Sequence, residues 1–283
     1  MNLYNRMPAK EVVILGSGDI GMIMARRLTL EGAHVKAVFE IQPYPSGLPR
    51  NIEQCLNDYN IPLYLSHTVT EIHGDKRLTG VTVSKVDEHM KPIPGTEEEY
   101  SCDTLILSVG LIPENELSLD AGVTLDTRTK GATVDEYFQT DRPGIFAAGN
   151  VLHVHDLVDF VSEEAGNAGR NAALYIHNNG EEEIPEEIKI TLSPKNGVRY
   201  TVPSEIRIGH MAEEQLVRFR VGNVYKNCYI RAYLDGERIF SRKKQVAAPG
   251  EMEQIKLKKE QLLSILEGKQ KQDKHELVIQ VEE

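Results

Sequence analysis

Three glycines near the N-terminus, Gly16, Gly18 and Gly21, have the spacing G-x-G-x-x-G and could bind phosphate through backbone amides. They follow the apolar run Glu11–Leu15, which predicts a buried parallel strand, and they precede apolar residues at helical spacing over residues 20–31. The first glycine permits a tight turn, the second lets the backbone approach a diphosphate, and the third lets the helix pack on the strand. The N–H groups that open the helix then favour an anion.

This context predicts a dinucleotide site rather than a glycine-tightened turn that binds nothing. Its expected residues are Gly16, Ser17, Gly18, Asp19, Ile20 and Gly21. Glu40 ends the next predicted strand, residues 35–39, at about the twenty-residue distance from the glycines that is typical of an acid binding the adenosine ribose. The Ile-Gln-Pro sequence that follows offers no cation for a 2′-phosphate, which favours NAD(H) over NADP(H).

The elements that position this site form a βαβ unit, which continues into further strands. A helix is expected over residues 51–59 and a short strand over 62–65. Three alternating segments predict an antiparallel meander that replaces a crossover helix: residues 69–73, 78–86 and 98–102. The apolar runs 104–109 and 144–148 each predict a buried strand, and the second precedes a helix expected over 157–176.

These patterns divide the chain into four segments of an α/β protein. Residues 9–110 form the predicted nucleotide-binding domain, 111–177 a second segment, and 178–187 an acidic, Pro- and Gly-containing linker. Residues 188–283 have a period of two and predict an all-β sandwich. Its expected elements are strands over 217–221, 228–234, 239–243 and 277–281, a turn at 235–236, and a short helix at 259–266.

Composition excludes several classes of function. A formal net charge of −11 argues against a nucleic-acid-binding surface, and no segment approaches the length of about 20 apolar residues that spans a bilayer. Cys55, Cys102 and Cys228 are widely spaced, form no disulfide framework and contain no C-x-x-C pair. We therefore expect a cytoplasmic protein without a redox dithiol, which could form a homodimer.

Residues 11 to about 176 resemble the two-dinucleotide flavoproteins that include the pyridine nucleotide–disulfide oxidoreductases. The resemblance rests on the glycine motif, the meander, the Ser108–Pro113 segment with its Gly110, and the run 140–150, which ends in Gly149-Asn150. It is closest to the non-disulfide branch, such as the alpha-type subunits of opine oxidases and hydrogen cyanide synthase. The resemblance implies that NAD(H) and FAD are the cofactors, and that Gly110, Gly149 and Asn150 contribute to binding them.

Two departures from that family qualify the resemblance. The family's late motif ends in Gly-Asp, whereas Asn150 occupies the acid's place here, and an amide can still bond a flavin hydroxyl. The family's first G-x-G-x-x-G motif, which holds the ADP half of FAD, is missing. We therefore expect a fragment, or a chain completed by a partner oxidoreductase subunit, with the edge of the 144–148 strand and the face of the 157–176 helix exposed.

A compact His-x-His-Asp cluster, His153, His155 and Asp156, follows the predicted flavin-binding strand. It could bind a metal, position substrate or relay protons beside the flavin, or serve a surface or capping role. Alternating histidines on an extended segment share a face, but no third and fourth ligand have recognisable spacing. The sequence therefore predicts no metal site.

The sequence leaves three functions to compare. The first is an FAD-dependent oxidoreductase that passes hydride between NAD(H) and FAD, a step that requires no acid–base residue, so no catalytic residue is assigned. The second is a non-catalytic NAD(H)-binding module that docks onto a flavoprotein subunit. The third is a two-domain NAD dehydrogenase with its own substrate site, for which no set of residues is evident.

Overall fold

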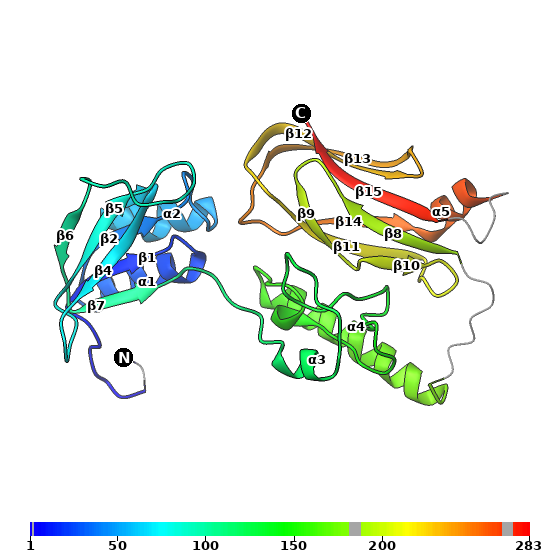
Figure 1. Ribbon diagram of the computed structural model, residues 1–283, viewed down its shortest axis with the longest axis horizontal. Coiled ribbons are helices and arrows are strands. Elements are labelled where there is room, and N and C mark those ends of the chain that lie inside the picture. Colours follow the sequence, from blue (N-terminus) through cyan, green and yellow to red (C-terminus); the bar gives the residue numbers. More distant parts are fainter. Residues whose placement is uncertain (2, 181–187, 268–273) are drawn as a thin grey trace. The chain divides into compact units, whose positions relative to one another are not determined.

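The computed structural model describes residues 1, 3–180, 188–267 and 274–283 (Figure 1). The chain divides into two compact units, Met1–Gly110 and Leu111–Glu283, each of which is described separately below. The division falls after Gly110, where the predicted nucleotide-binding domain ends. Most of the predicted linker, residues 181–187, lies outside the described residues.

A four-stranded parallel sheet forms the centre of the first unit, with the order β3-β2-β1-β7. Its strands are β1 (Glu11–Leu15), β2 (His34–Glu40), β3 (Leu63–Leu65) and β7 (Thr104–Leu107). The helices of this unit are α1 (Asp19–Leu30), α2 (Pro49–Cys55) and the 3-10 turn η1 (Asn57–Tyr59). This parallel sheet confirms the predicted α/β class.

The two faces of the parallel sheet are covered by different elements because side chains alternate along each strand. Val12 and Ile14 of β1 pack with Met22, Ala25 and Leu28, which are spaced three to four residues apart along α1. The intervening Val13 packs on the opposite face with residues of an antiparallel meander. The meander consists of β4 (His67–His73), β5 (Gly80–Lys85) and β6 (Glu98–Ser101), as predicted.

Two details of the first unit differ from the sequence expectations. Residues 104–109 do not form a buried strand: β7 ends at Leu107, and Leu107 and Val109 are each 64% exposed. The reason is that β7 lies at the edge of the sheet, where only β1 pairs with it. The helix expected over 51–59 is divided into α2 and η1, and it ends at Asn60 in the left-handed conformation with φ of 54°.

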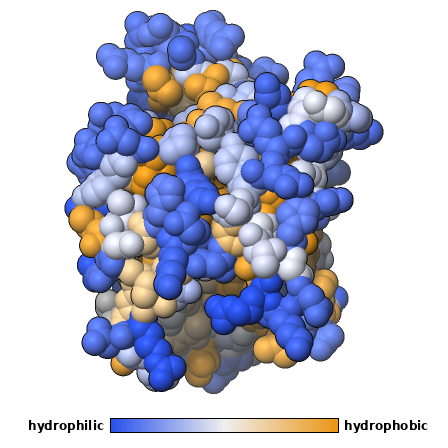
Figure 2. All heavy atoms as spheres, turned by 90° about the vertical axis from the view of Figure 1, so that its left-hand side faces the viewer, coloured by the Kyte–Doolittle hydropathy of each residue, from blue (hydrophilic) through white to orange (hydrophobic). Residues whose placement is uncertain are grey.

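Exposed large apolar side chains occur in both units, for example Leu3, Ile72, Ile112 and Leu117. Figure 2 shows one face on which hydrophilic residues dominate and apolar residues occur in small groups between them. Within the described ranges, none of the helices combines the length and apolar character that crossing a bilayer requires.

The second unit begins with loops and three helical segments. These are α3 (Glu116–Asp120), the 3-10 turn η2 (Gly149–Val151) and the long helix α4 (Val158–His177). The buried strand predicted over 144–148 is not formed: a single bridge joins Phe146 to Gln139, and the segment remains half-buried. Its backbone instead bonds locally, from Thr140 to Ile145 and from Ala147 to Phe138.

Two packed sheets complete the second unit. The larger has the order β10-β8-β15-β12-β13 and the smaller β14-β11-β9, and their inner faces share one apolar core. The strands are β8 (Lys189–Pro194), β9 (Val198–Val202), β10 (Glu205–Arg207), β11 (Glu214–Val221), β12 (Tyr225–Leu234), β13 (Glu237–Ala247), β14 (Glu253–Lys258) and β15 (His275–Glu282). The sequence predicted β11, β12, β13 and β15, together with helix α5 (Lys259–Leu266), but not the other four strands.

The sheets and the preceding segment share a second apolar core, which is why they form one unit. Tyr200 and Val202 of β9 pack with Val134, Phe138 and Ala168, the last of which lies on α4. Elsewhere α4 exposes apolar side chains, as the sequence led us to expect. Val158, Leu174 and Ile176 are each more than half exposed.

Candidate functional site

The glycine turn between β1 and α1 requires glycine at Gly16, and Ser108 crowds the positions of Gly18 and Gly21. Gly16 has φ of +93°, and a Cβ atom there would lie 2.1 Å from the carbonyl oxygen of Ser108. A Cβ on Gly18 would lie 2.9 Å from Ser108 Oγ, and one on Gly21 would lie 2.5 Å from Ser108 Cβ. The N–H groups of Gly16, Ser17 and Gly21 donate to Phe39 O, Glu40 Oε2 and Ser108 Oγ. The groups suited to an anion are therefore those of Gly18 and the first residues of α1, which have no intrahelical acceptor.

Ser108, which follows β7, is a site residue that sequence reasoning missed. Its Oγ accepts a hydrogen bond from the Gly21 N–H at 3.1 Å, and its own N–H donates to Leu15 O at 2.7 Å. Ser108 lies at the carboxyl end of β7, and the carboxyl ends of parallel neighbours such as β1 and β7 lie at the same edge of a sheet. Its position directly after an apolar run is the sequence signal that could have identified it. Ser108 thus positions the third glycine of the motif.

The carboxylate of Glu40 is buried beside the glycine turn. Its Oε2 accepts hydrogen bonds from the Ser17 N–H at 2.9 Å, from Ser17 Oγ at 2.6 Å and from Ser46 Oγ at 3.0 Å. Its Oε1 accepts one from the Gln42 N–H at 3.0 Å. The pairing of β2 with β1 therefore places an oriented carboxylate next to the glycine turn, where an acid that binds ribose is expected.

Two other residues of the predicted motif have different surroundings. Asp19 Oδ1 accepts hydrogen bonds from the Leu48 N–H at 2.8 Å and from Asn51 Nδ2 at 2.7 Å, so this carboxylate holds the loop that leads into α2. Ile20 is 72% exposed at the start of α1, so its side chain adds no core packing there. The glycines, Ser17 and Glu40 together fit a dinucleotide.

The other residues predicted to bind the cofactors lie at the end of the first unit or in the second unit. Gly110 ends the first unit with φ of +98°. The Gly149 N–H donates to Glu164 Oε1 at 2.7 Å, and Asn150 Oδ1 accepts from the His155 N–H at 3.1 Å. Gly149 and Asn150 thus orient the His-x-His loop, which leaves the amide nitrogen of Asn150 as the group of this pair suited to a flavin hydroxyl.

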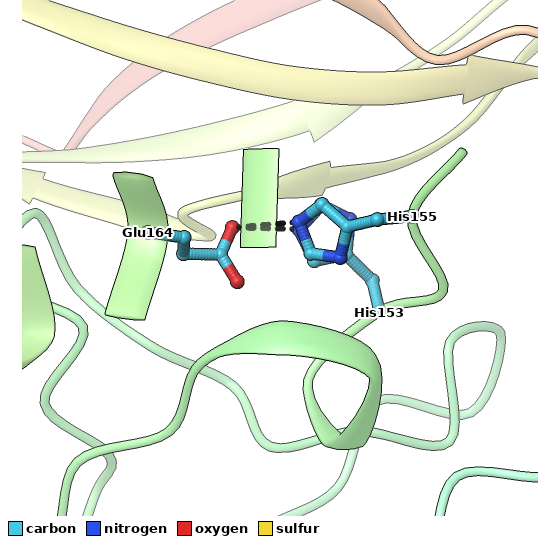
Figure 3. Close-up of side chains that lie close together, drawn as sticks. All are labelled: His153, His155 and Glu164. Carbon is cyan, nitrogen blue, oxygen red and sulfur yellow. Dashed lines mark hydrogen bonds and ion pairs between the residues drawn. The ribbon is translucent and has the colours of Figure 1, made fainter. Parts of the chain in front are cut away.

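The structure brings His153 and His155 together around Glu164, a residue of α4 that sequence reasoning missed (Figure 3). Glu164 Oε2 lies 3.0 Å from His153 Nε2 and 3.1 Å from His155 Nε2, and all three side chains are buried. Glu164 sits nine positions after His155, across the loop that leads into α4. No local spacing rule connects a loop to an internal helix position.

Two arginines of β11 attach the sheet to this loop and helix. Arg218 bonds Glu164 Oε2 at 3.3 Å and also pairs with the neighbouring Glu163. Arg220 donates to Val154 O at 3.0 Å and pairs with Asp156. Asp156 is therefore engaged in an ion pair that binds the loop to the sheet.

Burial and hydrogen bonding set the charges of the cluster. Desolvation lowers the pKa of His153 and outweighs the opposing effect of its bond to Glu164. Desolvation alone would raise the pKa of Glu164, but the hydrogen bonds from His153 and His155 together lower that pKa to about 2. A carboxylate therefore faces a neutral His153 at neutral pH.

A cavity of about 300 Å³ opens beside Glu164 and Arg218. It is also lined by Glu136, whose pKa is raised to about 7 by burial and by the nearby Asp135, against the opposing effect of Arg207. Arg207 Nε lies 3.0 Å from Glu136 Oε1, and His210 Nδ1 lies 3.8 Å from the same oxygen. Perturbed carboxyl groups in clefts are typical of functional sites, and the sequence provided no signal for this one.

Glu136 is expected to make folding stability fall as the pH rises from about 4.5 to about 7. In that window the folded protein retains a proton that the unfolded chain has lost, and the shift corresponds to about 3 kcal/mol in total. Glu136→Gln should remove this component, because its amide does not titrate. Urea unfolding of the wild type and the variant at several pH values between about 4.5 and 8 measures the difference.

Glu214→Gln is the matched control, since Glu214 lines the same cavity from an exposed position. Its stability difference from the wild type should stay constant over the window. A constant difference for Glu136→Gln would instead show that Glu136 is ionised in the folded protein throughout.

Comparison with known proteins shows which family the chain belongs to. The family model of pyridine nucleotide-disulphide oxidoreductases matches residues 2–173. Thioredoxin reductase of Listeria monocytogenes is 31% identical over 185 residues, which is 64% of this chain and 53% of that protein. Hydrogen cyanide synthase subunit HcnB of Pseudomonas aeruginosa is 28% identical over 236 residues, covering 76% of this chain and 46% of that protein.

The fold comparison agrees with these matches. A solved thioredoxin reductase of Lactococcus lactis has a TM-score of 0.53 and 22% identity, covering 60% of this chain and 54% of that one. The chain spans about half the length of the curated relatives it matches. The cofactors of the family are a pyridine nucleotide and FAD, as the resemblance implied. The chain belongs to the pyridine nucleotide-disulphide oxidoreductase family.

Proposed function

We propose that this chain supplies the nicotinamide-binding part of an oxidoreductase that passes hydride between NAD(H) and FAD. In this proposal the amides of Gly18 and the start of α1 bind the diphosphate, and Glu40 binds the adenosine ribose. Gly149 and Asn150 lie toward the flavin. The bound cofactors supply the redox chemistry, while the protein binds and orients them and excludes water.

One observation carries the proposal: the buried Glu40 carboxylate lies 2.9 Å from the Ser17 N–H inside the glycine turn. The strand β2 brings together an acid and a turn that are 23 positions apart in the chain. Oε2 already accepts three hydrogen bonds within the chain, so Oε1, which accepts one from the Gln42 N–H, is the oxygen suited to a ribose hydroxyl, whereas a 2′-phosphate would meet a negative charge. This arrangement favours NAD(H) over NADP(H).

The flavin half of the proposal rests on the second unit. The 144–148 segment forms one bridge, and α4 exposes Val158, Leu174 and Ile176. These apolar side chains would become buried against the strands that complete a flavin-binding sheet. Those strands would come from another chain segment or from a partner subunit. We therefore propose that this chain binds FAD fully only when the strands that complete the sheet are present.

A second candidate is a non-catalytic NAD(H)-binding module that docks onto a partner flavoprotein subunit. The partial flavin-binding segment favours it, because Gly149 and Asn150 already bond Glu164 and His155 within the chain. NADH-dependent dye reduction by the purified chain, with and without added FAD, separates the two. Turnover that depends on FAD supports the oxidoreductase, and turnover without any flavin contradicts both candidates.

Glu40→Ala is expected to weaken NADH binding by roughly 10- to 100-fold, because a charged hydrogen bond to the ribose contributes about 1.5–3 kcal/mol. NADPH binding should not fall comparably, since the carboxylate disfavours the 2′-phosphate. Fluorescence titration of both coenzymes against the wild type and the variant measures the effect. Ser46→Ala is the matched control, because it removes one bond to Glu40 Oε2 and leaves the carboxylate in place. Tighter binding of NADPH than NADH by the wild type would contradict the ribose assignment.

A further inference from the structure

Two imidazole nitrogens and a guanidinium converge on one carboxylate oxygen in the second unit. Glu164 Oε2 lies 3.0 Å from His153 Nε2, 3.1 Å from His155 Nε2 and 3.3 Å from Arg218 Nη1. A carboxylate oxygen has about two lone-pair directions, so three N–H donors cannot all bond it well. Nδ1 of each histidine is buried without a hydrogen-bond partner among the described residues, so Nε2 is the only ring nitrogen that faces a polar group.

We infer that His153 Nε2, His155 Nε2 and Glu164 Oε2 form a binding site for a divalent transition-metal ion, with Zn²⁺ as the best-suited member. The three ligand atoms all lie within 4.8 Å of one another. Bonds of about 2.0–2.1 Å in a tetrahedral zinc site place neighbouring ligand atoms about 3.3 Å apart. The two nitrogen–oxygen separations are within a few tenths of an ångström of that value, and the two nitrogens lie within 4.8 Å of each other.

The donor set selects the class of metal. Two neutral imidazoles and one carboxylate suit zinc and its neighbours in the first transition row, whereas Mg²⁺ and Ca²⁺ prefer oxygen ligands. With three protein ligands the fourth position of a tetrahedral ion stays open for water. The cavity of about 300 Å³ reaches the carboxylate side of the site, because Glu164 and Arg218 line it, whereas neither histidine does.

The groups around Glu164 hold it in position for this role. The Gly149 N–H bonds Oε1 at 2.7 Å, and Arg218 approaches Oε2. A carboxylate that binds a metal is ordinarily hydrogen-bonded in this way, and its oxygens can accept such bonds beside the metal bond. The charge of Arg218 is offset by its pair with Glu163, which lessens repulsion of a cation.

The His-x-His spacing and the helix contribute different parts of the site. The rings of His153 and His155 lie beside each other with centroids 4.2 Å apart, and Glu164 faces them from the second turn of α4 (Figure 3). The ion would therefore tie the loop that follows Gly149 to α4. This role is independent of the nucleotide-binding turn in the first unit and does not rest on the proposed hydride transfer.

The test uses the full chain, freed of metal by a chelator and then titrated with Co²⁺ and Zn²⁺. We expect one Co²⁺ per chain with the visible absorption of a four-coordinate site, and a rise in the melting temperature on adding Zn²⁺. The double variant His153→Gln/His155→Gln should lose both responses, with affinity reduced more than about 100-fold.

His275→Gln is the matched control, because His275 is buried in the same unit and pairs with one carboxylate, Asp235, at 2.8 Å. It should bind Co²⁺ as the wild type does. Wild-type protein that gives no visible Co²⁺ band and no Zn²⁺ response would overturn the inference, whether or not the double variant folds. Equal Co²⁺ binding by the wild type and a folded double variant would also overturn it.

Discussion

Gly16→Ala is expected to abolish NADH binding and to destabilise the first unit by several kcal/mol. The new Cβ would lie 2.1 Å from the backbone oxygen of Ser108, and backbone cannot move aside as a flexible side chain can. The left-handed φ of +93° adds strain of about 1–2 kcal/mol. Urea unfolding and calorimetric titration with NADH measure the two effects.

Gly32→Ala separates strain from crowding. Gly32 has nearly the same φ, +97°, but a Cβ there meets no atom within 4 Å. It should cost only about 1–2 kcal/mol and leave NADH binding unchanged. Equal losses of stability in the two variants would mean that contact with Ser108 plays no part.

A double variant distinguishes folding from binding at the second glycine. Gly18→Ala places Cβ 2.9 Å from Ser108 Oγ, and Ser108→Ala removes that oxygen. The double variant should recover most of the stability of Ser108→Ala alone, with Ser108 O at 3.3 Å as the remaining close contact. It should still bind NADH poorly, because the added methyl group keeps the diphosphate from the backbone. Recovery of NADH affinity together with stability would contradict the assignment of this turn as the diphosphate site.

Glu164→Ala is expected to destabilise the second unit by about 3–5 kcal/mol, the cost typical of breaking a buried ion pair by removing one partner. The side chain is fully buried and bonds Gly149, His153, His155 and Arg218. Its removal leaves a buried guanidinium and the Gly149 N–H without this acceptor. Urea unfolding in the presence of a chelator measures the loss apart from any bound metal.

Glu163→Ala is the matched control, since the neighbouring carboxylate pairs with the same arginine. Its side chain is 55% exposed, so water can replace it, and we expect a loss below about 1 kcal/mol. Similar losses for the two variants would show that burial of Glu164 does not determine the strength of the cluster.

The first unit was predictable because its signals are local. The glycine spacing, the apolar run of β1 and the period of α1 lie within 20 consecutive residues, and each follows from backbone geometry. The prediction was wrong for 144–148 and for the burial of 104–109. Both runs are apolar, but whether such a run becomes a buried strand depends on neighbours that its own residues do not specify.

The clusters in the second unit could not be predicted in the same way. The Glu164 cluster joins a loop, a helix and β11, and Arg218 lies more than fifty positions beyond Glu164. Glu136 acquires its raised pKa from burial beside Asp135 and Arg207, which comes from packing against the sheet rather than from sequence spacing.

By itself, the sequence determined the glycine turn, the acid at the end of β2 and the α/β class, because short-range sterics and hydrogen bonding specify them. Only the tertiary structure decided that Ser108 lies against the three glycines of the turn and that His153, His155 and Glu164 lie close together. Their proximity results from sheet pairing and apolar packing over long separations. Burial then gives these polar groups the strong mutual interactions that exposed side chains lack.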